Sequence, residues 1–184
     1  HHQGERAKVV LAASGVRAEA QRTMESLAAR MSDCRVEDAV SMATTHLVVG
    51  TDAQGLALQR STKYLTAMAR GLWIVTDRWV TDSAAAGGWE PEAPYEVAGD
   101  KHARGGPQRA RLRVARGEAP LLAGIPCLLD SDGYSLTLDP AALKRIALLA
   151  GATMVERCGR HFVPEGSALA DTADTGRPPA NAIA

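Results

Sequence analysis

Three residues of this sequence have groups suited to holding an anion. Ser14 and Gly15 directly follow a short apolar run, Lys8–Ala13, and Lys63 lies in a segment whose apolar residues recur at helical spacing. A serine hydroxyl and a free glycine amide at a strand-to-helix turn can each donate a hydrogen bond, and a lysine ammonium can add a charge-assisted one. Taken alone, however, a Ser-Gly pair after a strand is usually a turn, and a lysine on a helix is usually solvated.

Other chemistry is not indicated by the residue types or by their spacing. The sequence contains no P-loop, no GxGxxG pattern and no nucleophile–base set, so we expect no enzymatic activity and no cofactor. Cys34, Cys127 and Cys158 are widely spaced and lack a CxxC pattern, which predicts a reduced protein without a disulfide scaffold or a metal site. No apolar run approaches the roughly 18 residues of a membrane span, so no membrane association is expected. Lys+Arg and Asp+Glu number 21 each, which argues against binding to nucleic acid by bulk charge alone.

The first part of the chain has the pattern of an α/β domain. The sequence is 184 residues long and 46% apolar, enough for one large domain or two of about 90 residues each. Short apolar runs alternate with segments of helical periodicity, an order that predicts a mainly parallel sheet with helices on its faces. We expect this domain over residues 8–89, with strands near 8–13, 35–37, 45–49 and 73–75 and helices near 18–31, 61–70 and 77–86.

A segment rich in proline, glycine and basic residues interrupts this pattern over residues 90–118, and we interpret it as a linker between domains. After it, the order strand, helix, strand, strand returns. Asp139-Pro140 predicts the start of a helix, and Arg160–Val163 resembles Thr45–Val48. Residues 119–184 are therefore predicted to form a second, incomplete repeat, since they contain no match to the tryptophan-bearing strand and helix of the first.

Several segments in sequence order carry a resemblance to a known family: Val10–Gly15, Thr44–Val49, Gln59–Leu65, Gly71–Ser83, Tyr95–Asp100 and Gly106–Arg111. Together they resemble a tandem BRCT module, which consists of two small α/β repeats, each with a central parallel sheet flanked by helices. The resemblance covers roughly residues 8–163, linker included. It implies that Trp79 anchors the last helix of the first repeat.

The resemblance implies that the first repeat recognises phosphoserine. The matching positions are Ser14, Gly15 and Lys63, whose hydroxyl, amide and ammonium would contact the phosphate. A phosphate carries about −1.5 to −2 charges and several strong acceptors, which suit these donors. Ser61 either supports this site through its hydroxyl or only caps its helix.

The resemblance also implies a groove between the repeats that accepts an apolar side chain three residues after the phosphoserine. Arg60 matches an arginine whose backbone and guanidinium hold the peptide main chain there. Leu65 matches a lining position that is aromatic in a member of the family, so a pocket of different size is expected. The second-repeat residues that would complete this groove have no match in residues 164–184.

These expectations predict a non-catalytic, monomeric, phosphoserine-peptide-binding module of a nuclear DNA-damage-response protein. The resemblance implies that a RING ubiquitin-ligase domain would lie outside this chain. One alternative is a chromatin reader, in which the basic linker residues Lys101–Arg116, with Arg109, Arg111 and Arg113, contact the nucleosome. Another alternative is a structural interaction module whose phosphate site is vestigial.

Overall fold

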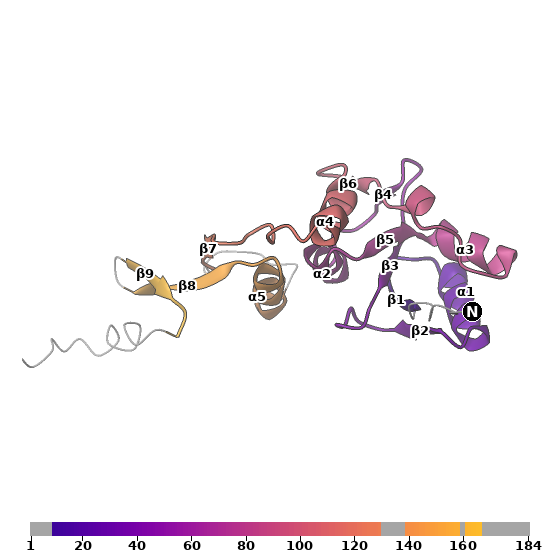
Figure 1. Cartoon of the computed structure of the whole chain (residues 1–184), viewed down its shortest axis with the longest axis horizontal. Helices are drawn as coiled ribbons and strands as arrows, with labels where there is room; N and C mark the ends of the chain where they lie inside the picture. The colour runs from indigo at the N-terminus through magenta and orange to yellow at the C-terminus, as the bar shows by residue number, and fades with distance from the viewer. Residues whose placement is uncertain (1–8, 130–138, 159–160, 167–184) are drawn as a thin grey trace, which may run out of the picture. The chain divides into compact units, whose positions relative to one another are not determined.

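The computed structural model describes residues 9–129, 139–158 and 161–166 (Figure 1). The chain divides into two compact units, one ending at Pro120 and one beginning at Leu121.

The first unit is built on a four-stranded parallel sheet. Its strands are β1 (Val9–Ser14), β2 (Cys34–Glu37), β3 (His46–Val49) and β5 (Trp73–Thr76), in the order β2-β1-β3-β5. Every pair in this sheet is parallel. Parallel neighbours require crossover connections, and the helices between the strands supply them. The predicted α/β fold with a parallel central sheet is confirmed.

Three helices flank this sheet: α1 (Ala18–Arg30), α2 (Thr62–Arg70) and α3 (Asp77–Ala86). Alternate residues of the strands point to opposite faces, so β3 sends Val48 to one face and Leu47 to the other. Val48 packs in a cluster with side chains of α1 and α3, whereas Leu47 packs in a cluster with side chains of α2. The sheet therefore separates α2 from the other two helices.

The segment interpreted as a linker has more regular structure than its composition predicts. It contains a 3-10 helix, η1 (Ala93–Tyr95), a short strand, β6 (Gly99–Asp100), and a helix, α4 (Gly106–Ala115). Strand β6 pairs in parallel with β4 (Leu56–Ala57), which precedes α2. The glycine and proline that suggested a break instead start α4, because Gly105 adopts φ 73° at the N-cap and Pro107 occupies the first turn.

Helix α4 packs against α2 in the first unit. Gly71, the C-cap of α2, has φ 65°, and a β-carbon there would come within 2.8 Å of the Val114 β-carbon of α4. The two helices approach closely because position 71 has no side chain.

The second unit repeats the predicted order of elements but not the pairing of the first sheet. It contains β7 (Pro126–Cys127), α5 (Pro140–Leu149), β8 (Thr153–Cys158) and β9 (His161–Pro164). Strands β7 and β8 are parallel, but β9 pairs antiparallel with β8. Only two residues separate β8 from β9, too few for the crossover that parallel neighbours need.

The predicted start of α5 is confirmed, because the Asp139 carboxylate accepts a hydrogen bond from the Ala142 amide at 3.1 Å and Pro140 is the first helical residue. His161 was matched with His46, but it is exposed, whereas His46 is buried. Residues 130–138, 159–160 and 167–184 of the second repeat, Arg160 of the predicted match included, lie outside the described residues.

Candidate functional site

The end of β1 and the start of α2 bring together the side chains singled out from the sequence. The Ser14 and Ser61 hydroxyl oxygens are 2.6 Å apart and share a hydrogen bond. The Lys63 ammonium donates to the Ala13 carbonyl oxygen at 2.9 Å, so it lies beside the residue that precedes Ser14. Two hydroxyls and one ammonium from two elements thus converge next to the Ser14-Gly15 turn.

Gly15 and Gly50 shape the backbone of this turn. Gly15 has φ 65°, a conformation that favours glycine, and it is exposed. A β-carbon on Gly50 would overlap the Gly15 carbonyl oxygen. Gly50 was read from the sequence only as the end of a strand, yet the turn cannot form with a larger residue there. The sequence places a glycine just after each of two predicted strands, and this pattern could have indicated that the two turns touch.

Ser61 is the N-cap of α2, as one of the two sequence-based interpretations held. Its hydroxyl oxygen accepts a hydrogen bond from the Tyr64 amide at 3.2 Å. The same oxygen contacts Ser14, so capping and support of the cluster are combined in one side chain. Because the cap orients the first turn of α2, it also orients Lys63, which lies two residues further along.

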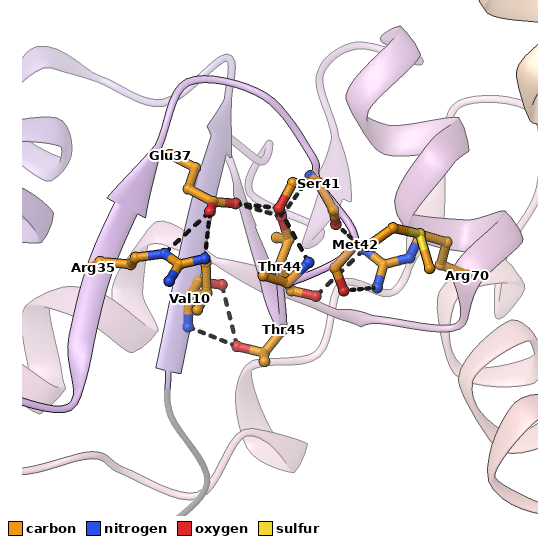
Figure 2. A network of polar contacts seen from close by, with 9 residues as sticks. Val10, Arg35, Glu37, Ser41, Met42, Thr44, Thr45 and Arg70 are labelled. Atoms are coloured by element: carbon orange, nitrogen blue, oxygen red, sulfur yellow. Dashed lines mark hydrogen bonds and ion pairs between the residues drawn. The ribbon is translucent and has the colours of Figure 1, made fainter.

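The C-terminal end of α2 is fastened to the connection between β2 and β3 (Figure 2). The Arg70 guanidinium donates to the carbonyl oxygens of Ser41, Met42 (2.9 Å) and Thr44 (3.4 Å). Glu37 completes this connection by accepting from the hydroxyls of Ser41 at 2.7 Å and Thr44 at 3.0 Å. Helix α2 is thereby held at both ends, which fixes its position against the sheet.

The Glu37 carboxylate is stabilised in its charged form by these neighbours. Hydrogen bonds from Ser41, Arg35 and Thr44 hold the pKa of Glu37 below its usual value, although its burial opposes the shift. Burial also lowers the pKa of Arg70, but an arginine remains charged across the physiological range. The network in Figure 2 is therefore a structural ion and hydrogen-bond network at neutral pH.

The Arg60 guanidinium pairs with Asp100 of the linker segment. Its Nε and Nη2 donate to both carboxylate oxygens at 2.9–3.1 Å, in bidentate geometry. The Asp100 side chain is 5% exposed, whereas that of Arg60 is 41% exposed. Burial would raise the pKa of Asp100, but hydrogen bonds from the His102 amide and Arg60 outweigh it, so the pKa lies below its usual value. In this structure the Arg60 guanidinium is engaged within the first unit.

Leu65 is half-buried and packs beside the core cluster that contains Tyr64 and Ala67. Its side chain therefore contributes to the interior of the first unit.

The basic residues of the linker segment differ in how they are held. Arg111 is 18% exposed, and its guanidinium binds the Glu96 carboxylate through two hydrogen bonds of 2.8 and 2.9 Å. The same guanidinium lies 3.7 Å from the centroid of the Trp73 ring. Arg113 donates to the Ala119 carbonyl oxygen at 3.3 Å, while Arg109 is exposed. Arg111 is thus part of the packing of α4, and its charge is already paired.

Two further findings concern the part of the chain that the structure describes. Within it, no three His, Cys, Asp or Glu side chains are grouped as metal ligands would be. No described helix is both long enough and apolar enough to cross a bilayer.

Comparison with known proteins shows which family part of the first unit resembles. The family model described as BRCA1 C Terminus (BRCT) domain matches residues 9–84. The Protein BREAST CANCER SUSCEPTIBILITY 1 homolog of Arabidopsis thaliana is 28% identical over 126 residues, which cover 68% of this chain and 13% of that protein. The Breast cancer type 1 susceptibility protein homolog of Mus musculus is 30% identical over 122 residues, which cover 65% of this chain and 6% of that protein. The chain therefore spans a small fraction of the length of either relative.

The solved structure of the BRCT5-BRCT6 domains of Brc1 from S. pombe is similar in fold. The TM-score is 0.53 at 19% sequence identity, and the match covers 80% of this chain and 65% of that chain. At this identity the likeness shows the fold. Residues 9–84 therefore match the BRCT family model, and the fold of the chain is similar to that of a tandem BRCT pair.

Proposed function

We propose that the first unit binds a phosphoserine peptide through Ser14, Gly15 and Lys63, with Ser61 as a supporting residue. The observation that carries the proposal is the convergence of the two hydroxyls, 2.6 Å apart, with the Lys63 ammonium beside the same turn. These residues also match the family's phosphate-binding positions.

The hydrogen bonds of the cluster suit a phosphate acceptor. The Tyr64 amide donates to the Ser61 oxygen, so the Ser61 proton is available to Ser14. With Ser61 as the donor of that shared bond, the Ser14 proton is free for an incoming oxygen. An ammonium has three protons, of which the Ala13 carbonyl takes one, so Lys63 retains two donors for a phosphate. The exposed Gly15 amide would be a further neutral donor.

The charge balance explains why phosphorylated and plain serine would differ. A phosphate bears about −1.5 to −2 charges, and a hydrogen bond to a charged group is worth roughly twice a neutral one. An unmodified serine hydroxyl would gain none of the Lys63 attraction. We therefore assign discrimination to Lys63 and positioning to Ser14 and Ser61.

The proposal is tested by fluorescence anisotropy with a labelled phosphoserine peptide and its unphosphorylated twin. The phosphopeptide is expected to bind with micromolar affinity or better, and at least about tenfold more tightly than the twin, or roughly 1.4 kcal/mol. Equal affinity for the two peptides would overturn the proposal and favour the alternative of a structural module with a vestigial site.

We also propose a cellular setting for this module. The names of the two relatives and the BRCT family support a place in a nuclear DNA-damage-response protein. Localisation of a fluorescently tagged chain before and after irradiation tests it, and a tagged chain that stays outside the nucleus would contradict it. In the chromatin alternative, Arg111 is not available to contact the nucleosome, because its guanidinium already pairs with Glu96.

A further inference from the structure

A compact loop, Asp100–Arg104, follows strand β6. The Asp100 amide donates to the Ala103 carbonyl at 2.9 Å, and its carboxylate accepts from the His102 amide at 2.8 Å and the Ala103 amide at 3.2 Å. A β-carbon on Gly99 would overlap the Ala103 carbonyl oxygen, so the loop closes tightly on the strand before it. The backbone of this loop is therefore fixed by its own hydrogen bonds.

The loop lies beside the segment that leads into the candidate phosphate site. Strand pairing aligns Ala57 with Asp100, and the Arg60–Asp100 ion pair fastens the two segments together three residues later. Arg60 directly precedes Ser61, the N-cap of α2. On the other side, a β-carbon on Gly15 would lie 4.0 Å from the Gln59 side chain. Residues 59–61 thus separate the Ser14-Gly15 turn from the loop.

The loop presents positive charge that the described part of the chain does not neutralise. Lys101 and Arg104 are exposed, and among the described residues no carboxylate lies within 4.0 Å of either side-chain nitrogen. Arg60, by contrast, is already matched by the buried Asp100 carboxylate. The Arg60–Asp100 pair therefore fastens the loop that carries these two exposed cations to the segment before α2. Two exposed cations beside the segment that leads into the candidate phosphate site create a local preference for an anion.

Resting on the proposed function, we infer that Lys101 and Arg104 form a second subsite, which binds a glutamate or aspartate of the same peptide. An extended peptide advances roughly 3.3 Å per residue, so a ligand anchored at Ser14 can reach the far side of residues 59–61 with a residue a few positions from its phosphoserine. Asp100 acts as a positioning residue for this subsite, because it orders the loop without facing the ligand.

The experiment measures the binding of the full chain to phosphoserine peptides in an alanine background. A single glutamate is moved stepwise along both sides of the phosphoserine, and each peptide is compared with its glutamine twin. At one position or two adjacent ones, glutamate is expected to bind at least about threefold more tightly than glutamine, as for an exposed ion pair, and the gain should shrink with added salt.

The variant Lys101→Gln/Arg104→Gln is expected to abolish the glutamate gain and to retain the preference for phosphoserine over serine. The matched control is Arg22→Gln/Arg78→Gln, which removes the same charge from exposed positions on α1 and α3, on the other face of the sheet. This control should keep the full glutamate gain.

Three outcomes would overturn the subsite while leaving the proposed function intact: no position with a glutamate gain, a gain that survives in the loop variant, or an equal loss in the control. A loop variant that loses affinity for a short DNA duplex, with no glutamate gain in the wild type, would assign the loop to nucleic acid instead. If the wild-type chain showed no preference for phosphoserine over serine, the proposed function would be wrong, and the subsite that rests on it would be wrong as well.

Discussion

The imidazole ring of His46 stacks on the indole of Trp79, with ring centroids 4.8 Å apart and ring planes 9° apart. Trp89 stacks on Trp79 in turn, with centroids 4.9 Å apart. Trp79 is fully buried, and its indole nitrogen donates to the Glu90 carbonyl at 2.8 Å. A single side chain therefore joins helix α3 to strand β3 of the sheet and to the start of the linker segment.

Replacement of Trp79 should unfold the first unit. Trp79→Ala leaves a large cavity between α3 and the sheet, and a loss of about 3–5 kcal/mol is expected, comparable with the whole stability of a small domain. Circular dichroism during thermal unfolding measures the effect. Wild-type melting in this variant would show that the helix does not depend on the indole.

A pair of conservative changes separates the hydrogen bond from the packing. Trp79→Phe loses the bond to Glu90, whereas Trp89→Phe removes a buried nitrogen that has no partner in the described structure. Leaving the Glu90 carbonyl unpaired adds a cost of about 1 kcal/mol or more to the first change, and the second relieves an unsatisfied donor. Urea denaturation should rank Trp79→Phe as the less stable variant; the opposite ranking would contradict this account.

The pH dependence of stability should reflect His46. Burial lowers the pKa of His46 below its ordinary value of about 6.5, although Glu92, 3.2 Å from its Nε2, opposes the shift. The unfolded chain then takes up a proton at a higher pH than the native chain does. The free energy of unfolding is therefore highest above about pH 6.5 and falls as the pH is lowered through that value.

Urea denaturation followed by tryptophan fluorescence tests this prediction, because all three tryptophans lie in the first unit. The decrease in the free energy of unfolding between about pH 7.5 and about pH 5.5 should be smaller in His46→Gln than in the wild type. It should be unchanged in the control His102→Gln, whose side chain is exposed. An identical slope in wild type and His46→Gln would exclude His46 as the source.

Arg111 and Arg109 should respond differently to the same substitution. Lysine cannot reproduce the bidentate bond to Glu96 or the planar stack on Trp73, so Arg111→Lys should weaken the packing of α4. The full removal Arg111→Ala would leave the buried Glu96 carboxylate unpaired, at a cost on the order of 3 kcal/mol. Arg109→Ala, on the exposed side, should change the melting temperature little. Equal destabilisation by both alanine variants would show that the Glu96 pair contributes nothing specific.

Lys63 and Ser14 should be coupled in phosphopeptide binding. Lys63→Met keeps most of the apolar stem and should cost on the order of 1.5–3 kcal/mol of binding free energy, against about 1 kcal/mol for Ser14→Ala. Because both groups would touch one phosphate, the double variant should lose less than the sum of the two. Titration calorimetry on folded proteins measures this cycle. Strict additivity, or full affinity in Lys63→Met, would place the phosphate elsewhere.

Local patterns in the sequence were sufficient to predict the strands of the first sheet and the places of some site residues at the ends of these elements. Strands β1 and β3 are short apolar runs, and α1 has apolar residues at helical spacing, so each element follows from neighbours in the chain. The positions of Ser14 and Ser61 at the ends of such elements were also local features. Their contact is not a local feature, because they lie 47 positions apart in the sequence and only the packing of β1 against α2 brings them together.

The sequence alone determined the α/β class of the first unit and its order of elements, because apolar periodicity and turn residues act over a few positions. The residues expected to meet a phosphate came instead from the resemblance to a family. Only the tertiary structure decided that Arg60 is bound to Asp100, that the Arg111 guanidinium stacks on Trp73, and that β9 pairs antiparallel with β8. Each of these depends on which of several available partners a charged side chain or strand edge meets once the chain is packed. That choice is set by distances between segments far apart in sequence, which no local pattern records.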